Sequence, residues 1–166
     1  SAASDVYKRQ KLIITPTITQ KLTDPSLESW FSATNLGSYT EDIAGSSTIN
    51  RETTDPHGGT YCARMDIDAT PSTCQFRQVA AHAIGFYRAA AWLKGSAGTG
   101  EKIAYGAETG STPTNAEAYA ALTTAWARYR RSTRTTSATT PIFYIKAVTA
   151  AGKSIYACLL YTSPSP

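Results

Sequence analysis

A glycine-rich run and the two histidines are the first candidates for binding phosphate or a metal ion. GSAGTGEK (Gly95–Lys102) is similar in composition to a phosphate-binding loop, but that motif needs Lys directly after its last Gly, followed by Ser or Thr. Glu101 follows that glycine here, so we predict a flexible hairpin loop. His57 and His82 are the only histidines and have no second ligand at metal-binding spacing. We predict that both are structural or solvated.

Acidic residues offer a second route to catalysis. Glu28, Glu52 and Glu108 could supply the carboxylate pair of glycoside hydrolysis, yet nothing in their spacing distinguishes them from surface charge. The sequence contains no G-x-S-x-G, no H-E-x-x-H and no Cys–His nucleophile pattern. We therefore predict that the chain is not an enzyme.

The arginine-rich stretch RYRRSTR (Arg128–Arg134) has two interpretations. It could bind nucleic acid or another anionic polymer, with Tyr129 stacking on bases, or it could be the solvated face of a strand. The formal net charge of +4 is too small to drive strong counterion release. We favour the solvated face and expect no nucleic-acid partner.

The two ends of the chain are related to each other. DVYKRQ (Asp5–Gln10) can be encoded by a DNA string whose reverse complement, read one base out of frame, encodes CLLYTS (Cys158–Ser163). These inverted copies resemble a translated transposon-type sequencing adapter. We therefore predict that residues 1–10 and 158–166 are adapter-derived and lie outside the core, and that the rest belongs to a larger polypeptide.

The remaining residues, about 150 of them, suit one domain. No apolar run approaches the roughly 18 residues of a membrane span, so no membrane partner is expected. The segment is rich in Thr, Ser, Ala and Tyr, with Gly and Pro between short apolar stretches, which is typical of an all-β sandwich or barrel. We predict a linker or edge strand over 11–21 and one all-β domain over 22–157.

Several stretches alternate between apolar and polar residues, as half-buried strands do. The alternation predicts strands in TYCARMDID, GFYRAAAWLKG, KIAYGAE, PIFYIKAVTA and KSIYA, the last two joined by the short turn AAGK. NAEAYAALTTAWARYRR contains the capping box TNAE (Thr114–Glu117), so we allow a helical turn near 115–121. We expect a strand from about Ala125 onward.

The cysteines at 62 and 74 are predicted to be free thiols. They lie on YCARMDI and CQFRQVA, which we expect to form a hairpin through DATPST. In that hairpin Cys62 would pair with about Val79 and Cys74 with about Ile67, which places the two sulfurs beyond disulfide reach.

Four stretches in order, DPSLESW, DPHGGTYCARM, YRAAAWLKG and TTAWARYR, resemble the CenC-like carbohydrate-binding modules. The resemblance runs from about Asp24 to the end of the expected domain. It implies a jelly-roll-like β-sandwich of two antiparallel sheets. It also implies a non-catalytic, extracellular or virion-associated module whose partner is a polysaccharide or cell-surface glycan. The same module type occurs in phage tail and fibre proteins, so a structural module without glycan binding stays open.

Sugar rings stack on aromatic faces, and their hydroxyls need polar neighbours. Trp92 shares one strand face with Arg88 and Lys94, opposite the predicted core face, and PIFYIKAVTA shows the same alternation. The candidate platform for a glycan therefore consists of Trp92, Arg88, Lys94, Tyr144 and Lys146. Trp30 and Trp126 match positions that the family uses for packing.

The resemblance further implies a structural calcium ion. Glu28 and the Gly59–Thr60 region match two parts of the family's site. The third ligand, an Asp, would fall just after Ala157, where the predicted adapter begins. Because Ca²⁺ requires oxygen ligands, we expect the site to be incomplete in this chain.

Overall fold

The computed structural model describes Gln20 and residues 22–68, 73–79, 85–98, 101–109, 119–135, 141–147 and 152–164. These segments form two five-stranded sheets and a two-stranded ribbon, β1-β2, and all their strand pairs are antiparallel. One sheet has the order β10-β7-β12-β5-β4 and the other has the order β3-β6-β11-β8-β9. The strands are β1 (Trp30–Ser32), β2 (Asn35–Leu36), β3 (Thr40–Ile43), β4 (Thr48–Glu52), β5 (Cys62–Asp66), β6 (Cys74–Val79), β7 (Gly85–Gly95), β8 (Lys102–Thr109), β9 (Tyr119–Ala121), β10 (Ala127–Thr135), β11 (Pro141–Ala147) and β12 (Ser154–Pro164).

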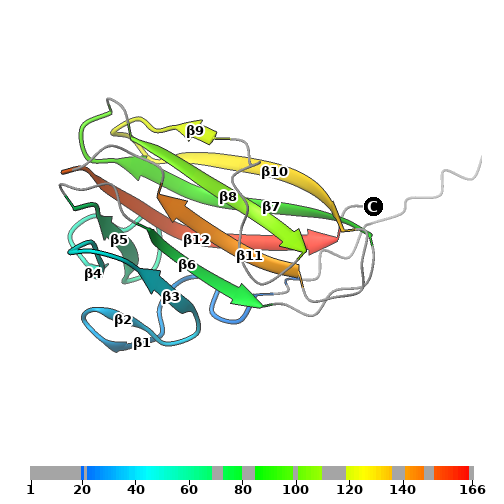
Figure 1. Cartoon of the computed structure of the whole chain (residues 1–166), viewed down its shortest axis with the longest axis horizontal. Coiled ribbons are helices and arrows are strands. Elements are labelled where there is room, and N and C mark those ends of the chain that lie inside the picture. The colour runs from blue at the N-terminus through cyan, green and yellow to red at the C-terminus, as the bar shows by residue number, and fades with distance from the viewer. Residues whose placement is uncertain are drawn as a thin grey trace, which may run out of the picture.

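The two large sheets lie one over the other, with the core between them (Figure 1). Each sheet turns alternate side chains inward, because successive residues of a strand point to opposite faces. Ala63, Met65, Leu93, Phe76 and Phe143 are fully buried in this core. The predicted all-β, jelly-roll-like sandwich of two antiparallel sheets is confirmed. The described residues contain no helix with the length and hydropathy of a membrane span.

The segment with mixed helix and strand signals is extended where the structure describes it. Residues 119–121 form β9, and the strand expected from about Ala125 begins as β10 at Ala127. The capping box at 114–117 lies outside the described residues. Because β9 pairs with β8 and β10 pairs with β7, sheet pairing overrides the local helix preference of an alanine-rich sequence.

The hairpin predicted from the sequence between β5 and β6 is wrong. β5 pairs with β4 and β12, whereas β6 pairs with β3 and β11. The connections from β5 to β6 and from β11 to β12 therefore cross from one sheet to the other. Crossing lets two consecutive strands bury their apolar faces against each other across the core. The predicted free thiols are confirmed, and Cys158 is also free.

The C-terminal strand corrects a second expectation. Residues from 158 onward were expected outside the core, yet the side chains of Cys158 and Leu160 are fully buried. The N–H of Leu160 donates to the carbonyl of Pro25 at 2.6 Å, and Gln20 Nε2 donates to the carbonyl of Leu160 at 3.1 Å. A register shift after Cys158, with Leu159 at φ 47°, forms a bulge in β12. The adapter origin of both ends stays a prediction, and residues 1–10 lie outside the described residues.

Candidate functional site

One row of side chains crosses the outer side of the β10-β7-β12-β5-β4 sheet. The register places Asn50 opposite Arg64, Arg64 opposite Tyr156, and Tyr156 opposite Lys94. Their strand neighbours, among them Met65, Leu93 and Ile155, point into the core, so this row faces outward. We call the outward-facing side chains of Asn50, Arg64, Asp66, Lys94 and Tyr156 the Arg64 face.

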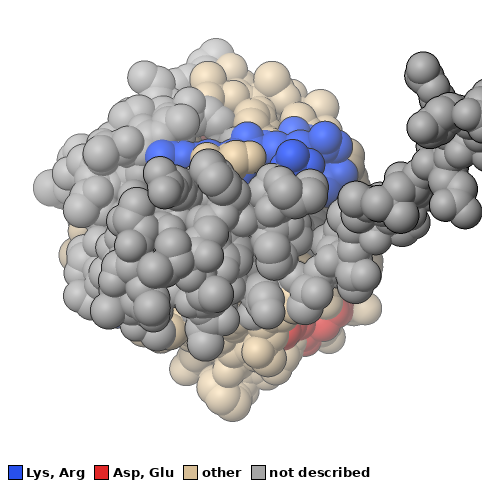
Figure 2. Space-filling model, turned by 90° about the vertical axis from the view of Figure 1, so that its right-hand side faces the viewer, with Lys and Arg blue, Asp and Glu red and all other residues tan. Residues whose placement is uncertain are grey.

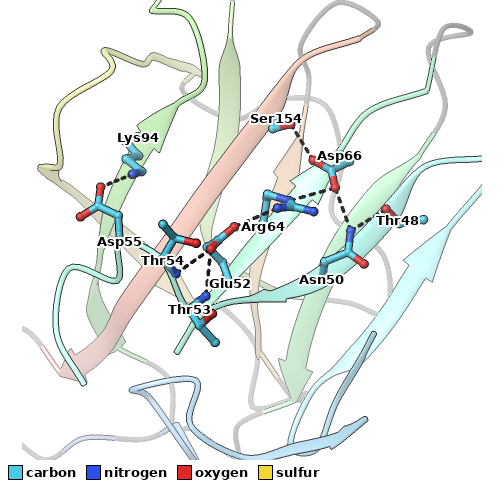
Figure 3. A network of polar contacts seen from close by, with 10 residues as sticks. All are labelled: Thr48, Asn50, Glu52, Thr53, Thr54, Asp55, Arg64, Asp66, Lys94 and Ser154. Carbon is cyan, nitrogen blue, oxygen red and sulfur yellow. Dashed lines mark hydrogen bonds and ion pairs between the residues drawn. The ribbon is translucent and has the colours of Figure 1, made fainter. Parts of the chain in front are cut away.

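Arg64 lies at the centre of a polar network (Figure 3). Its Nη1 donates to Glu52 Oε2 at 2.8 Å, and its Nε donates to Asp66 Oδ2 at 3.0 Å. Asp66 also accepts hydrogen bonds from Asn50 Nδ2 at 2.8 Å and from Ser154 Oγ at 2.6 Å. Because the three strands β4, β5 and β12 contribute to the network, the backbone fixes the directions of its donors and acceptors.

The network is only partly covered. The side chains of Arg64 and Asp66 are 35% and 34% exposed. Among the described residues, none accepts a hydrogen bond from Nη2 of Arg64 and none donates to Oδ1 of Asn50. The Arg64 face therefore presents a fixed donor and a fixed acceptor to a ligand.

Glu52 anchors this network from its buried end. Its Oε1 accepts hydrogen bonds from the backbone N–H groups of Thr54 at 2.7 Å and Thr53 at 2.9 Å. The N–H of Thr54 is the main cause that lowers the pKa of Glu52 to about 2, and Thr53 and Arg64 add to it against the opposing effect of burial. Glu52 thus stays ionised at neutral pH, which suits an anchor for Arg64 and not a general acid.

Lys94 lies at the end of the Arg64 face where the rings of Tyr156 and Trp126 come together. Its Nζ donates to Asp55 Oδ2 at 2.5 Å. The same atom lies 4.6 Å from the ring centroid of Tyr156 and 5.0 Å from that of Trp126, within cation–π range. Tyr156 is half-buried and stands between two cations, Lys94 on one neighbouring strand and Arg64 on the other.

Trp92 faces outward as predicted, but its ring is occupied. The imidazole of His57 stacks on it with centroids 3.7 Å apart and planes at 19°. His57 belongs to residues 53–61, the loop between β4 and β5, and it also meets the ring of Trp126 edge-on at 5.7 Å. Trp126 Nε1 donates to the carbonyl of Asp55 at 3.2 Å. The two tryptophans therefore hold this loop against the sheet.

The five residues of the predicted platform do not form one surface. Trp92, Arg88 and Lys94 lie on β7, whereas Tyr144 and Lys146 lie on β11 in the opposite sheet. Tyr144 is fully buried, together with Ile142. The prediction of a single platform is wrong because alternation along a strand reveals its two faces but not which sheet the strand joins.

Sequence reasoning missed three central members of the Arg64 face. The alternation in TYCARMDID already separated Arg64 and Asp66 from the core residues, which was the available signal. Tyr156 lies next to the expected end of the domain, and only its cross-strand partners show its role.

The three residues of the implied calcium site do come together. Glu28 Oε1 accepts hydrogen bonds from the N–H of Thr60 at 2.8 Å and of Tyr61 at 3.2 Å. Gly59 has φ +77°, and a Cβ there would lie 2.0 Å from the same oxygen. Only glycine fits this turn without displacing the Glu28 carboxylate.

The donor set here does not fit a calcium ion. One oxygen of Glu28 already binds two backbone N–H groups. Where the third ligand was expected, Cys158 Sγ lies 3.4 Å from the carbonyl of Gly58 and Leu159 packs beside it. A thiol and an aliphatic side chain are poor ligands for a hard cation. Among the described residues, no group of three His, Cys, Asp or Glu could hold a metal ion.

Comparisons with known proteins agree with the observed fold. No family model and no curated protein matches the sequence. TmCBM61 in complex with β-1,4-galactotriose is similar in structure, with a TM-score of 0.66, 16% identity, and coverage of 89% of this chain and 99% of that one. The CBM22-1 xylan-binding domain of Xyn10C from Paenibacillus barcinonensis has a TM-score of 0.57 at 14% identity, covering 84% of this chain and 90% of that one.

A phage protein shares the fold as well. The enzymatically active domain of tailspike protein 4 from bacteriophage CBA120 gives a TM-score of 0.65 at 11% identity, covering 88% of this chain but only 21% of that one. These similarities concern the fold, which is the jelly-roll sandwich that the two carbohydrate-binding modules and the tailspike domain share with this chain.

Proposed function

We propose that the chain is a non-catalytic glycan-binding module whose ligand lies on the Arg64 face. Tyr156 carries this proposal, because it lies between Arg64 and Lys94 of the two neighbouring strands and Lys94 Nζ lies 4.6 Å from its ring centroid. A pyranose bound over that ring would place its C–H face on an aromatic surface. Its hydroxyls would then reach the fixed groups of Arg64, Asp66 and Asn50.

The chemistry of the carboxylates supports a binding role. Glu52 is held ionised by backbone N–H groups. A glycosidase acid needs the opposite, a raised pKa beside an open substrate site. The similar modules that bind galactotriose and xylan support a glycan as the ligand class.

The test is binding to an array of neutral and acidic polysaccharides. We expect Tyr156→Ala to weaken the binding found there about fivefold, since a stacked aromatic contributes about 1 kcal/mol. Phe31→Ala is the matched control, because Phe31 is 78% exposed and lies on the separate β1-β2 ribbon. Equal affinity of both variants would contradict a site on the Arg64 face.

A structural module of a phage tail is the second candidate, and the tailspike similarity favours it. It predicts that the folded protein binds no polysaccharide on the array. Retention of any polysaccharide that depends on Tyr156 would exclude this candidate.

A further inference from the structure

The arginine-rich stretch is divided between two faces of an edge strand. β10 lies at the edge of its sheet, and it pairs Arg128 with Trp92, Tyr129 with Ala91, and Arg130 with Ala90. Tyr129 packs against the core, so Arg128 and Arg130 point outward. Both are exposed.

Arg88 extends this row on the neighbouring strand. It lies opposite Ser132, is exposed, and shares the outer side of β7 with Trp92. We call Arg88, Arg128 and Arg130 the arginine row. Residues 128 to 132 of β10 cover about 14 Å at about 3.4 Å per residue, so three guanidinium groups lie along a distance of a few sugar rings.

The arginine row and the Arg64 face lie on the same side of one sheet. Arg128 is opposite Trp92, and Trp92 is two residues from Lys94 on the same face of β7. Asp55 and His57 of the 53–61 loop contact Lys94 and Trp92 on this side of the sheet. A chain-like ligand that covers Tyr156 would therefore reach the arginines by passing over this loop. Figure 2 shows Lys and Arg atoms gathered in one band on the viewed side, while the described Asp and Glu atoms lie apart below it.

We propose that the ligand is an acidic polysaccharide, whose uronate carboxylates lie on the arginine row while a neighbouring sugar ring covers Tyr156. This inference rests on the proposed function. Planar carboxylates match the donor fork of guanidinium groups. A nucleic acid fits less well, because Tyr129, between Arg128 and Arg130, faces the core and donates its hydroxyl to the carbonyl of Ala121. Trp92, opposite Arg128, already has His57 stacked on its ring.

The experiment compares two polymers with the same sugar backbone, charged polygalacturonate and its uncharged, fully methyl-esterified form. Binding is measured in EDTA at 50 and 500 mM NaCl. We expect polygalacturonate to bind about tenfold more tightly at the lower salt concentration and to lose this advantage at the higher one. Arg128→Gln/Arg130→Gln should remove the preference, and Arg128→Lys/Arg130→Lys should retain most of it.

Arg51→Gln/Lys153→Gln is the matched control, since it removes the same charge from the far edge strand β4 and from the turn before β12. It should leave the preference unchanged, and circular dichroism should show that all variants are folded. If Arg128→Gln/Arg130→Gln and Arg51→Gln/Lys153→Gln reduce the preference for polygalacturonate equally, the preference reflects net charge. That result would overturn the arginine row as the site.

The remaining outcomes separate the two proposals. Equal binding of both polymers that still depends on Tyr156 would overturn the acidic ligand and leave the glycan-binding function standing. If no polysaccharide binds the folded protein, both proposals fail. Tighter binding of single-stranded oligothymidylate than of polygalacturonate would assign the arginine row to nucleic acid and overturn this inference.

Discussion

At the scale of single residues, backbone contacts decide which carboxylates stay charged. Glu52 is mostly buried, yet N–H groups from Thr53 and Thr54 and the guanidinium of Arg64 keep it ionised. In the sequence, nothing distinguished Glu52 from ordinary surface charge. Its role as the ionised partner of Arg64 could not be predicted. The donors come from a turn and from a neighbouring strand, and neither position is visible in residue spacing.

Glu52 should make the protein sensitive to acid. Its pKa is about 2 in the folded state and about 4.3 in an unfolded chain, so its stabilisation is complete above about pH 5 and is lost as pH falls toward 2. We expect Glu52→Gln to lower the free energy of unfolding by roughly 2–3 kcal/mol at pH 7 and by almost nothing at pH 2. Urea unfolding at both pH values measures this.

Glu41 supplies a control, because its pKa is shifted in the opposite direction from that of Glu52. Burial raises the pKa of Glu41, so its ionisation opposes folding as pH rises. The destabilisation by Glu41→Gln should therefore not increase between pH 2 and pH 7. A loss for Glu52→Gln that is independent of pH would contradict the assigned ionisation.

The three cysteines should be unreactive in the folded protein. All are fully buried, and burial raises the pKa of both Cys62 and Cys74 to about 12. Since the thiolate is the reactive form, we expect no modification by a disulfide reagent at pH 8 until denaturant is added. Rapid reaction of any thiol in the native protein would show that the loop over 53–61 opens or that the core is loose.

At the scale of elements, strands were predictable and their partners were not. Period-two alternation identified β5 and β7 and their core faces, which the burial of Met65 and Leu93 confirms. The predicted hairpin of β5 and β6 failed because a connection that crosses the sandwich has the same short polar sequence as a hairpin turn. The Arg64 face is built from cross-strand neighbours, so the sequence could predict parts of it but not the assembly.

The turn at 58–61 provides a test of one element. Gly59 and Gly152 both have positive φ, +77° and +71°, but a Cβ on Gly152 would meet nothing within 4 Å. We expect Gly152→Ala to cost about 1 kcal/mol from backbone strain alone. Gly59→Ala should cost at least 1 kcal/mol more, because it also displaces the Glu28 carboxylate. Equal losses in thermal unfolding would show that Glu28 does not pack on this turn.

At the scale of the whole molecule, the sandwich depends on its last strand. β12 lies between β7 and β5, and Leu160 is buried in the core. The sequence comparison of the two ends predicted that residues from 158 onward contribute nothing to the fold. That comparison concerned the origin of the residues, whereas burial depends only on their apolar character and on the strand that they extend.

Removal of residues 158–166 should therefore destabilise the whole molecule. We expect a chain that ends at Ala157 to lose cooperative unfolding or to melt at a much lower temperature. Leu160→Ala, a milder change, should cost about 2–5 kcal/mol. Melting of the shortened chain at the same temperature as the full chain would mean that β12 ends before the bulge.

The most direct test of the central claim is to map the bound glycan by NMR. The polysaccharide selected on the array, cut to an oligosaccharide, is titrated into isotope-labelled protein, and the shifts of backbone amides are followed. We expect the largest changes at Asn50, Arg64, Asp66, Lys94 and Tyr156, on the outer side of the β10-β7-β12-β5-β4 sheet. Changes concentrated on the opposite sheet, β3-β6-β11-β8-β9, would contradict the Arg64 face as the binding site.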